Sequence, residues 1–172
     1  MWWIGERHPG GRALDHVRLH LQRAFDAGVA VWEGVGRPDD AYDPRHKQWS
    51  STRILSWLAH SGPEGRVLGV TDVDLFIPIL TFVFGEARVG GRAAVVSTAR
   101  LGEPGLRDDR IVLERLSKES VHEMGHVLGL LHCETPGCVM GRSASVRDVD
   151  GKRGDLCPPC RGRLVRDNRE AT

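Results

Sequence analysis

Residues 122–133 read His-Glu-Met-Gly-His-Val-Leu-Gly-Leu-Leu-His-Cys and lie at the end of the longest helical pattern in the chain. On a helix, His122 and His126 are one turn apart and project from the same face, so both imidazoles can reach one metal ion. Gly129 can adopt a left-handed conformation that ends the helix, after which His132 can return as a third ligand. Three neutral histidine nitrogens with one open position are the arrangement of a catalytic zinc site.

Glu123 follows the first histidine and is placed to meet a water at the metal without being a ligand. An isolated pair of histidines four residues apart is more simply explained by a solvated face or by core packing. His16 and His20 are such a pair with no glutamate beside them, and we assign them to a solvated helix face. The complete pattern His-Glu-x-x-His-x-x-Gly-x-x-His instead favours a zinc site.

All four cysteines of the chain follow the third histidine. They form two close pairs on turns rich in Gly or Pro, Cys133 with Cys138 and Cys157 with Cys160. This spacing favours a structural zinc ion held by four thiolates. Such an ion would also order residues 133–172, which carry few apolar residues. Two disulfides, or a reactive thiol near the active site, are the alternatives.

The histidine run and the four cysteines resemble those of the archaemetzincins, a family within the metzincin zinc metallopeptidases. Met140 stands where that family has its methionine turn, beneath the catalytic metal. The chain has one tyrosine, Tyr42, so the tyrosine that some metzincins bring to the metal has no counterpart near Met140. The resemblance implies two zinc ions, one structural and one catalytic, with Glu123 as general base and the ligands His122, His126 and His132.

The rest of the chain predicts a mixed α/β fold. Helical periodicity covers about 12–25, 51–59 and 110–130, while extended segments cover 29–32, 67–71, 79–84 continuing toward 88, and 93–97. Gly90-Gly91 predicts a tight hairpin between the last two strands. Trp2 and Trp3 precede the first helix, and we expect them to be exposed. The resemblance implies a metzincin-like (α+β) fold with a twisted, mixed, five-stranded sheet. It also favours residues 80–88 as the upper edge of the cleft, while the sequence alone is equally consistent with an ordinary core strand.

Length and charge limit the other possibilities. With 172 residues we expect one metallopeptidase domain, in which residues 1–132 carry the active-site helix and residues 133–172 the methionine turn and the structural zinc. A net charge of +1 argues against binding to nucleic acid or to anionic lipid. No apolar run reaches the roughly 20 residues of a membrane-spanning helix. The first residues lack the features of a secretory signal, so we expect a cytoplasmic protein, and we expect a monomer.

These observations predict a zinc-dependent metallopeptidase that hydrolyses peptide bonds in a peptide or protein substrate, either as an aminopeptidase or on short peptides. The alternative is a catalytically silent, zinc-dependent protein that binds peptides or has a regulatory role. Glu123 argues for the enzyme, because a protein that only binds peptides has no need of a base at that position.

Overall fold

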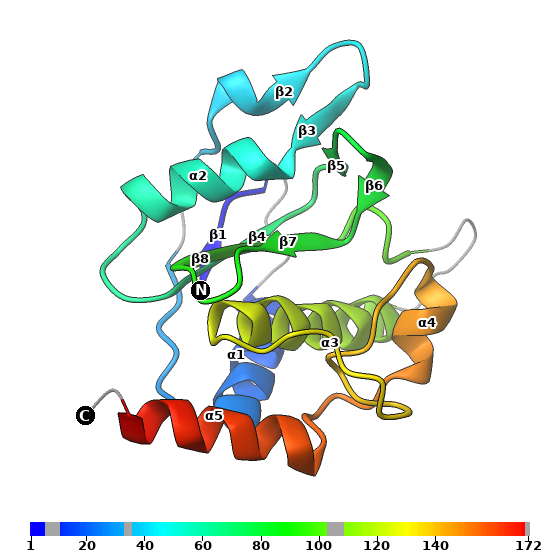
Figure 1. Cartoon of the computed structure of the whole chain (residues 1–172). Helices are drawn as coiled ribbons and strands as arrows, with labels where there is room; N and C mark the ends of the chain where they lie inside the picture. The colour runs from blue at the N-terminus through cyan, green and yellow to red at the C-terminus, as the bar shows by residue number, and fades with distance from the viewer. Residues whose placement is uncertain (6–10, 33–35, 103–108, 171–172) are drawn as a thin grey trace.

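The computed structural model describes residues 1–5, 11–32, 36–102 and 109–170. It has two mixed four-stranded sheets, with the strand orders β1-β4-β8-β7 (sheet A) and β2-β3-β5-β6 (sheet B). Helix α2 covers one face of sheet A, and α1 and α3 cover the other (Figure 1). The strands are β1 (Trp2–Trp3), β2 (Tyr42–Asp43), β3 (Gln48–Ser50), β4 (Val67–Thr71), β5 (Leu75–Ile77), β6 (Leu80–Val83), β7 (Gly85–Ala87) and β8 (Ala93–Ser97). The helices are α1 (Gly11–Phe25), the short 3-10 helix η1 (Asp39–Ala41), α2 (Ser51–Ser61), α3 (Asp109–Val127), α4 (Val146–Gly151) and α5 (Pro158–Glu170).

Sheet A forms the centre of the molecule. Its middle strands β4 and β8 are parallel, and every residue in both is buried. Burial on both faces explains why their sequences are continuous runs of small and apolar residues, with no alternation. The predicted mixed α/β class is therefore confirmed, and the predicted hairpin joins β7 to β8 with Gly90 at a φ of +66°.

The segment predicted as one strand from residue 79 toward 88 is split between the two sheets. Strand β6 pairs with β5, Val83 lying opposite Leu75, whereas β7 pairs with β8, Gly85 lying opposite Val96. Pro78 ends β5, so the apolar run 75–83 folds back on itself as a hairpin. The five-stranded sheet expected from the resemblance is thus two four-stranded sheets joined at Phe84.

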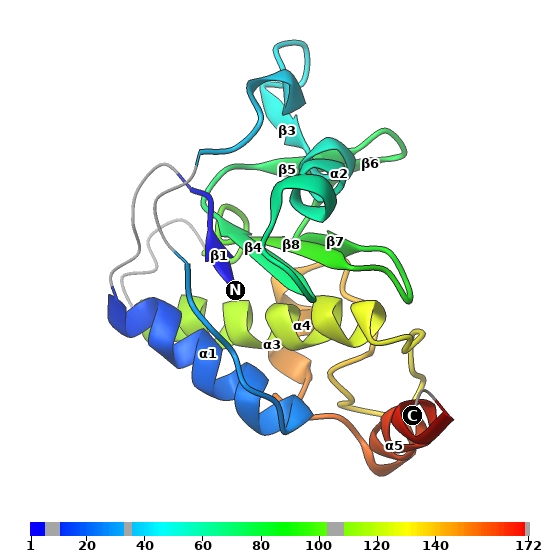
Figure 2. The ribbon, with the colours of Figure 1, turned by 90° about the vertical axis from the view of Figure 1, so that its left-hand side faces the viewer.

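The N-terminal residues are buried, so the expectation that Trp2 and Trp3 are exposed is wrong. Each is only 5% exposed, because β1 lies between β4 and the segment that follows α1. Figure 2 shows that segment running back from α1 toward the N-terminus. Within it the predicted strand 29–32 is reduced to a single bridge, where the Trp3 amide donates to the Trp32 carbonyl at 3.0 Å.

The C-terminal residues contain more regular structure than their composition predicted, because α4 and α5 both lie there. The main core cluster combines Leu14 and Val17 of α1 with Met140, Val149 and Leu156. Residues after 133 therefore share the core of the preceding part. In the described part of the chain, none of the helices has the length and apolar character needed to span a bilayer.

We predict that Gly69→Ala destabilises the protein by overpacking sheet A. A methyl group at this position in β4 would lie 2.6 Å from Leu58 Cδ1 and 3.1 Å from Ile4 Cδ1, and both side chains are fully buried. Overpacking of this kind should lower the free energy of unfolding by about 1–3 kcal/mol. Denaturant unfolding at constant zinc concentration measures the change. Gly162→Ala in α5, where nothing lies within 4 Å of the added methyl, is the control and should be neutral or stabilising.

Candidate metal centre and active site

The three predicted histidines converge in the structure. Their ligand nitrogens all lie within 4.8 Å of one another, and the Nε2 atoms of His122 and His126 are 3.1 Å apart. Two nitrogens at about 2.0–2.1 Å from one zinc ion, at tetrahedral angles, would be roughly 3.4 Å apart. His122 and His126 are buried, whereas His132 is exposed. The cluster therefore has the size of a zinc site and opens to solvent beside His132.

Backbone carbonyls orient the two buried imidazoles. The Val139 carbonyl oxygen lies 2.9 Å from His122 Nδ1, and the Leu130 carbonyl oxygen lies 2.7 Å from His126 Nδ1. A carbonyl can only accept, so each Nδ1 carries the hydrogen and each Nε2 keeps its lone pair. Hydrogen bonds of this kind fix the tautomer and the ring orientation of metal-binding histidines. Both Nε2 atoms are thus ready to bind a metal.

The end of α3 brings the third histidine to the cluster. Gly129 has a φ of +92°, its amide donates to the His126 carbonyl at 2.9 Å, and the Leu130 amide donates to the Gly125 carbonyl at 2.9 Å. These two bonds are those of a Schellman motif, in which glycine is favoured because the left-handed conformation is strained for other residues. The predicted role of Gly129 is confirmed, and the turn also supplies the Leu130 carbonyl that orients His126.

Burial keeps the imidazoles neutral. Desolvation, followed by the nearby Lys152 ammonium, lowers the pKa of His122 to about 3. Desolvation also lowers the pKa of His126 and of His132. Metal ions bind the neutral form of histidine, so these shifts favour occupation of the site at neutral pH.

Glu123 lies between α3 and β7. It is 6% exposed, and burial, followed by the charge of Glu119, raises its pKa well above the ordinary value. A methyl group on Gly85 would lie 2.8 Å from Glu123 Cγ and 2.9 Å from its Oε1, so β7 approaches the carboxylate closely only because residue 85 is glycine. Among the described residues no hydrogen-bond or ion-pair partner is found for this carboxylate.

Met140 packs beneath α3, as a methionine turn would. Its side chain is fully buried, and Met140 Sδ fills the space where Gly125 lacks a side chain. The Met140 carbonyl accepts from the Cys133 amide at 3.0 Å. The methionine therefore ties the backbone beside the cysteines to the helix that bears the histidines.

The four cysteines form a second cluster. The sulfurs of Cys133 and Cys157 are 3.8 Å apart, and those of Cys138 and Cys160 are 3.9 Å apart. Four sulfurs at about 2.3 Å from a zinc ion, at tetrahedral angles, would be separated by roughly 3.8 Å. None of the four is bonded to another in the structure, which favours the metal site over the disulfide alternative. Hydrogen bonds from Thr135 lower the pKa of Cys133, which favours the thiolate that binds metal.

Known proteins share this fold and are similar in sequence over most of the chain. The model of peptidase family M54 matches residues 64–166. The archaemetzincin of Methanopyrus kandleri is 44% identical over 90% of this chain and 87% of its own. The chain belongs to peptidase family M54. The crystal structure of the Methanopyrus kandleri archaemetzincin gives a TM-score of 0.88 at 37% identity, covering 98% of this chain and 93% of that one. A zinc-dependent peptidase from Methanocorpusculum labreanum gives 0.83 at 28% identity, covering 95% and 98%.

Membership of family M54 confirms the archaemetzincin resemblance and, with it, the predicted activity class, a zinc metallopeptidase. Both predicted groups of metal-binding side chains come together in this M54 peptidase. His16 and His20 belong to neither group. They are half-buried on α1, with ring centroids 4.4 Å apart.

Some groups around the histidine cluster of this M54 peptidase could not be identified from the sequence. The Val139 and Leu130 carbonyls are backbone atoms, and only their place in the fold gives them a role. Glu119 could have been found, since it lies three residues before His122 and therefore on the same helix face. Its partner Lys152 could not, because a loop and α4 separate it from the histidine motif.

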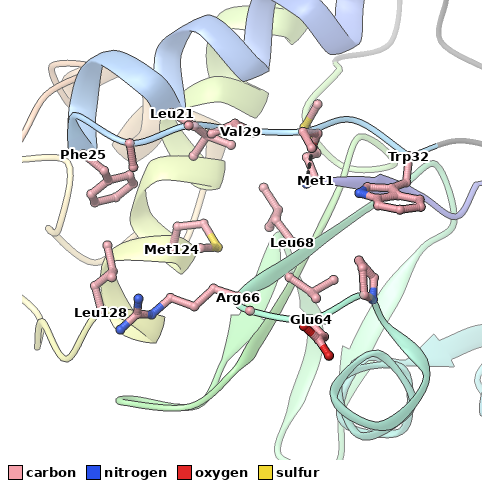
Figure 3. Close-up of a pocket in the computed structure, with 16 residues that line it drawn as sticks. Met1, Leu21, Phe25, Val29, Trp32, Glu64, Arg66, Leu68, Met124 and Leu128 are labelled. Carbon is pink, nitrogen blue, oxygen red and sulfur yellow. Dashed lines mark hydrogen bonds between the residues drawn. The ribbon is translucent and has the colours of Figure 1, made fainter.

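A large cavity in the described structure of this M54 peptidase lies away from the histidine cluster. It measures about 800 Å³ and is lined mainly by apolar side chains, including Leu21, Phe25 and Leu68 (Figure 3). Helix α3 contributes Met124, which lies about 200° around the helix from His122, and the turn that follows α3 contributes Leu128. The cavity thus opens on the other side of α3 from the histidines, and none of the seven candidate metal ligands lines it.

We predict that Cys157→Ser combined with Cys160→Ser removes one zinc ion per chain and lowers the midpoint of thermal unfolding. The four sulfurs hold two separate turns together, and ordering energy of this kind is lost with the metal. Elemental analysis of zinc per chain and thermal unfolding measure the two effects. An unchanged zinc content in the double variant would refute the four-thiolate site.

Proposed function

We propose that peptide-bond hydrolysis takes place at the three-histidine cluster, with a zinc ion held by the Nε2 atoms of His122 and His126 and by a ring nitrogen of His132. The 3.1 Å separation of the first two nitrogens and the carbonyls on both Nδ1 atoms support this proposal. The zinc ion would act as a Lewis acid toward the substrate carbonyl and would lower the pKa of water.

Glu123 is the proposed general base. The main support for the proposed function is that its buried carboxylate has no hydrogen-bond or ion-pair partner among the described residues. Every other ionisable side chain on this buried face of α3 has a protein partner among the described residues, namely Arg115, Glu119, His122 and His126. The free Glu123 carboxylate can accept the proton of the attacking water and return it to the departing amine. Its raised pKa makes it a stronger base, and a nearby divalent cation would favour the ionised form that the reaction requires.

An extended peptide is the proposed substrate, bound along β6 and β7. Both strands are last in the order of their sheets, so each has an edge without a strand partner in the described structure. A peptide can add to such an edge through main-chain hydrogen bonds. Glu123 touches Gly85 in β7, so a peptide on this edge would lie next to the base.

The cysteine cluster is proposed to hold a second, structural zinc ion, giving two ions per chain. The sulfur separations of 3.8 and 3.9 Å support this assignment. The related protein of Methanocorpusculum labreanum is named a zinc-dependent peptidase, which supports the choice of zinc. The cytoplasmic location, the monomeric state, the two-part division at residue 133 and the absence of nucleic-acid or membrane binding stay predictions.

We predict that Glu123→Ala retains the fold and both metals but loses peptide hydrolysis, with kcat at least about 10²-fold lower. A diverse peptide mixture is digested by zinc-loaded protein and analysed by mass spectrometry, so that the cut positions also separate amino-terminal trimming from internal cleavage. Glu114→Ala, at an exposed glutamate of the same helix, is the matched control and should retain activity.

Two results would contradict this proposal. Turnover by metal-loaded Glu123→Ala protein would show that another group acts as the base. Absence of cleavage by the wild type, with both zinc ions bound and many sequences offered, would favour the peptide-binding alternative.

A further inference from the structure

A buried ion pair lies one helical turn behind the histidine cluster. Lys152 Nζ and Glu119 Oε1 are 2.9 Å apart, and each side chain is only 4% exposed. The Ser143 hydroxyl donates to the same oxygen at 3.3 Å. Glu119 lies on α3, while Ser143 and Lys152 flank α4, so three parts of the chain meet at one carboxylate.

Stability alone is a weak explanation for this pair. Removing two charges from water is costly, and replacing a buried ion pair by apolar residues of similar size is often neutral or stabilising. A neighbouring contact, the Arg115–Asp150 pair at 2.7 Å, already joins α3 to α4 at a partly exposed position. The Glu119–Lys152 pair is therefore better explained by the exact placement that it imposes.

The backbone connects Lys152 to the acceptor of His122 in a few steps. The amide of the next residue, Arg153, donates to the Gly137 carbonyl at 2.8 Å. Two residues after Gly137, the Val139 carbonyl accepts from His122 Nδ1 at 2.9 Å. The Ser143 contact holds the other end of this loop at Glu119. Both the helix that bears His122 and the loop that orients it are thus fixed to the same buried pair.

We propose that Lys152 is a positioning residue for the zinc site: its ion pair with Glu119 holds the loop 137–143 against α3, and thereby keeps the Val139 carbonyl on His122 Nδ1. The proposal rests on the proposed function, because it assumes that His122 binds the metal. It predicts that Lys152 affects the histidine site while the cysteine cluster retains its ion.

The test is Lys152→Met, which removes the charge and keeps much of the length of the side chain. Histidine-ring NMR of the full chain reports the His122 Nδ1–H signal, and zinc titration against a competing chelator gives the affinity of the histidine site. We expect the Nδ1–H signal to shift or broaden and the zinc affinity to fall about 10–100-fold, the usual effect of losing an outer-shell partner. Zinc at the cysteine cluster should remain.

Lys118→Met is the matched control. Lys118 is also buried, its side chain being 8% exposed, and it also contacts the end of α4, through the Asp150 carbonyl at 3.3 Å. It pairs with the exposed Glu114 and does not contact Glu119 in the described structure. This variant should lose stability yet retain the His122 signal and the zinc affinity of the wild type.

Four outcomes would contradict the proposal or the zinc site on which it rests. An unchanged His122 signal and unchanged zinc affinity in Lys152→Met overturn the proposal, as does an equal loss in Lys118→Met. If Lys152→Met does not fold, Glu119→Gln with Lys152→Met removes both charges, and wild-type zinc affinity in that variant overturns the proposal equally. Failure of the wild-type histidine rings to respond to zinc refutes the zinc site itself and is seen before any variant is made.

Discussion

Helix α3 has a polar face that is buried inside the protein. The side chains on this face need hydrogen-bond or ion-pair partners, and the surrounding structure provides them. Arg115, Glu119, His122, Glu123 and His126 lie along one side of the helix and are all at most 8% exposed. Burying such groups without partners costs several kcal/mol. The segment after the helix supplies the partners: two carbonyls for the imidazoles, Asp150 for the guanidinium and Lys152 for one carboxylate. Of these five side chains, Glu123 is the one for which the described residues supply no hydrogen-bond or ion-pair partner.

The cysteine cluster explains how a segment with so little core can provide these partners. Apart from Val139, Met140, Val149 and Leu156, the residues between Cys138 and Cys157 are mostly polar or small. The four sulfurs join the two ends of this segment, and the Val139 amide also reaches the Asp155 carbonyl at 3.4 Å. His132 and Cys133 are adjacent, so the two clusters share one stretch of backbone. Contacts that fix the backbone at Cys133 therefore also fix the position of His132.

The parts of the site that were predictable are those in which residue type and local spacing determine the geometry. The i, i+4 histidines, the left-handed Gly129 and the paired cysteines each act through a few neighbouring residues. What could not be predicted depends on tertiary pairing. The apolar run 75–83 and the residues that follow it divide between two sheets because β6 pairs with β5 whereas β7 pairs with β8, and periodicity within a strand does not reveal its partner. Trp2 and Trp3 are buried for the same reason, since β4 and Trp32 lie on either side of them.

The different exposure of the three histidines shows which side of the candidate site faces solvent. His122 and His126 are held from behind by carbonyls, while His132 remains exposed and follows a turn whose conformation requires glycine. On the opposite side, the close contact between Gly85 and Glu123 leaves no space between β7 and the helix. The candidate site is therefore open beside His132, and β7, which has an edge without a strand partner in the described structure, borders it at Gly85. The large apolar cavity lies on the other side of α3, and the polar face of the helix points away from it.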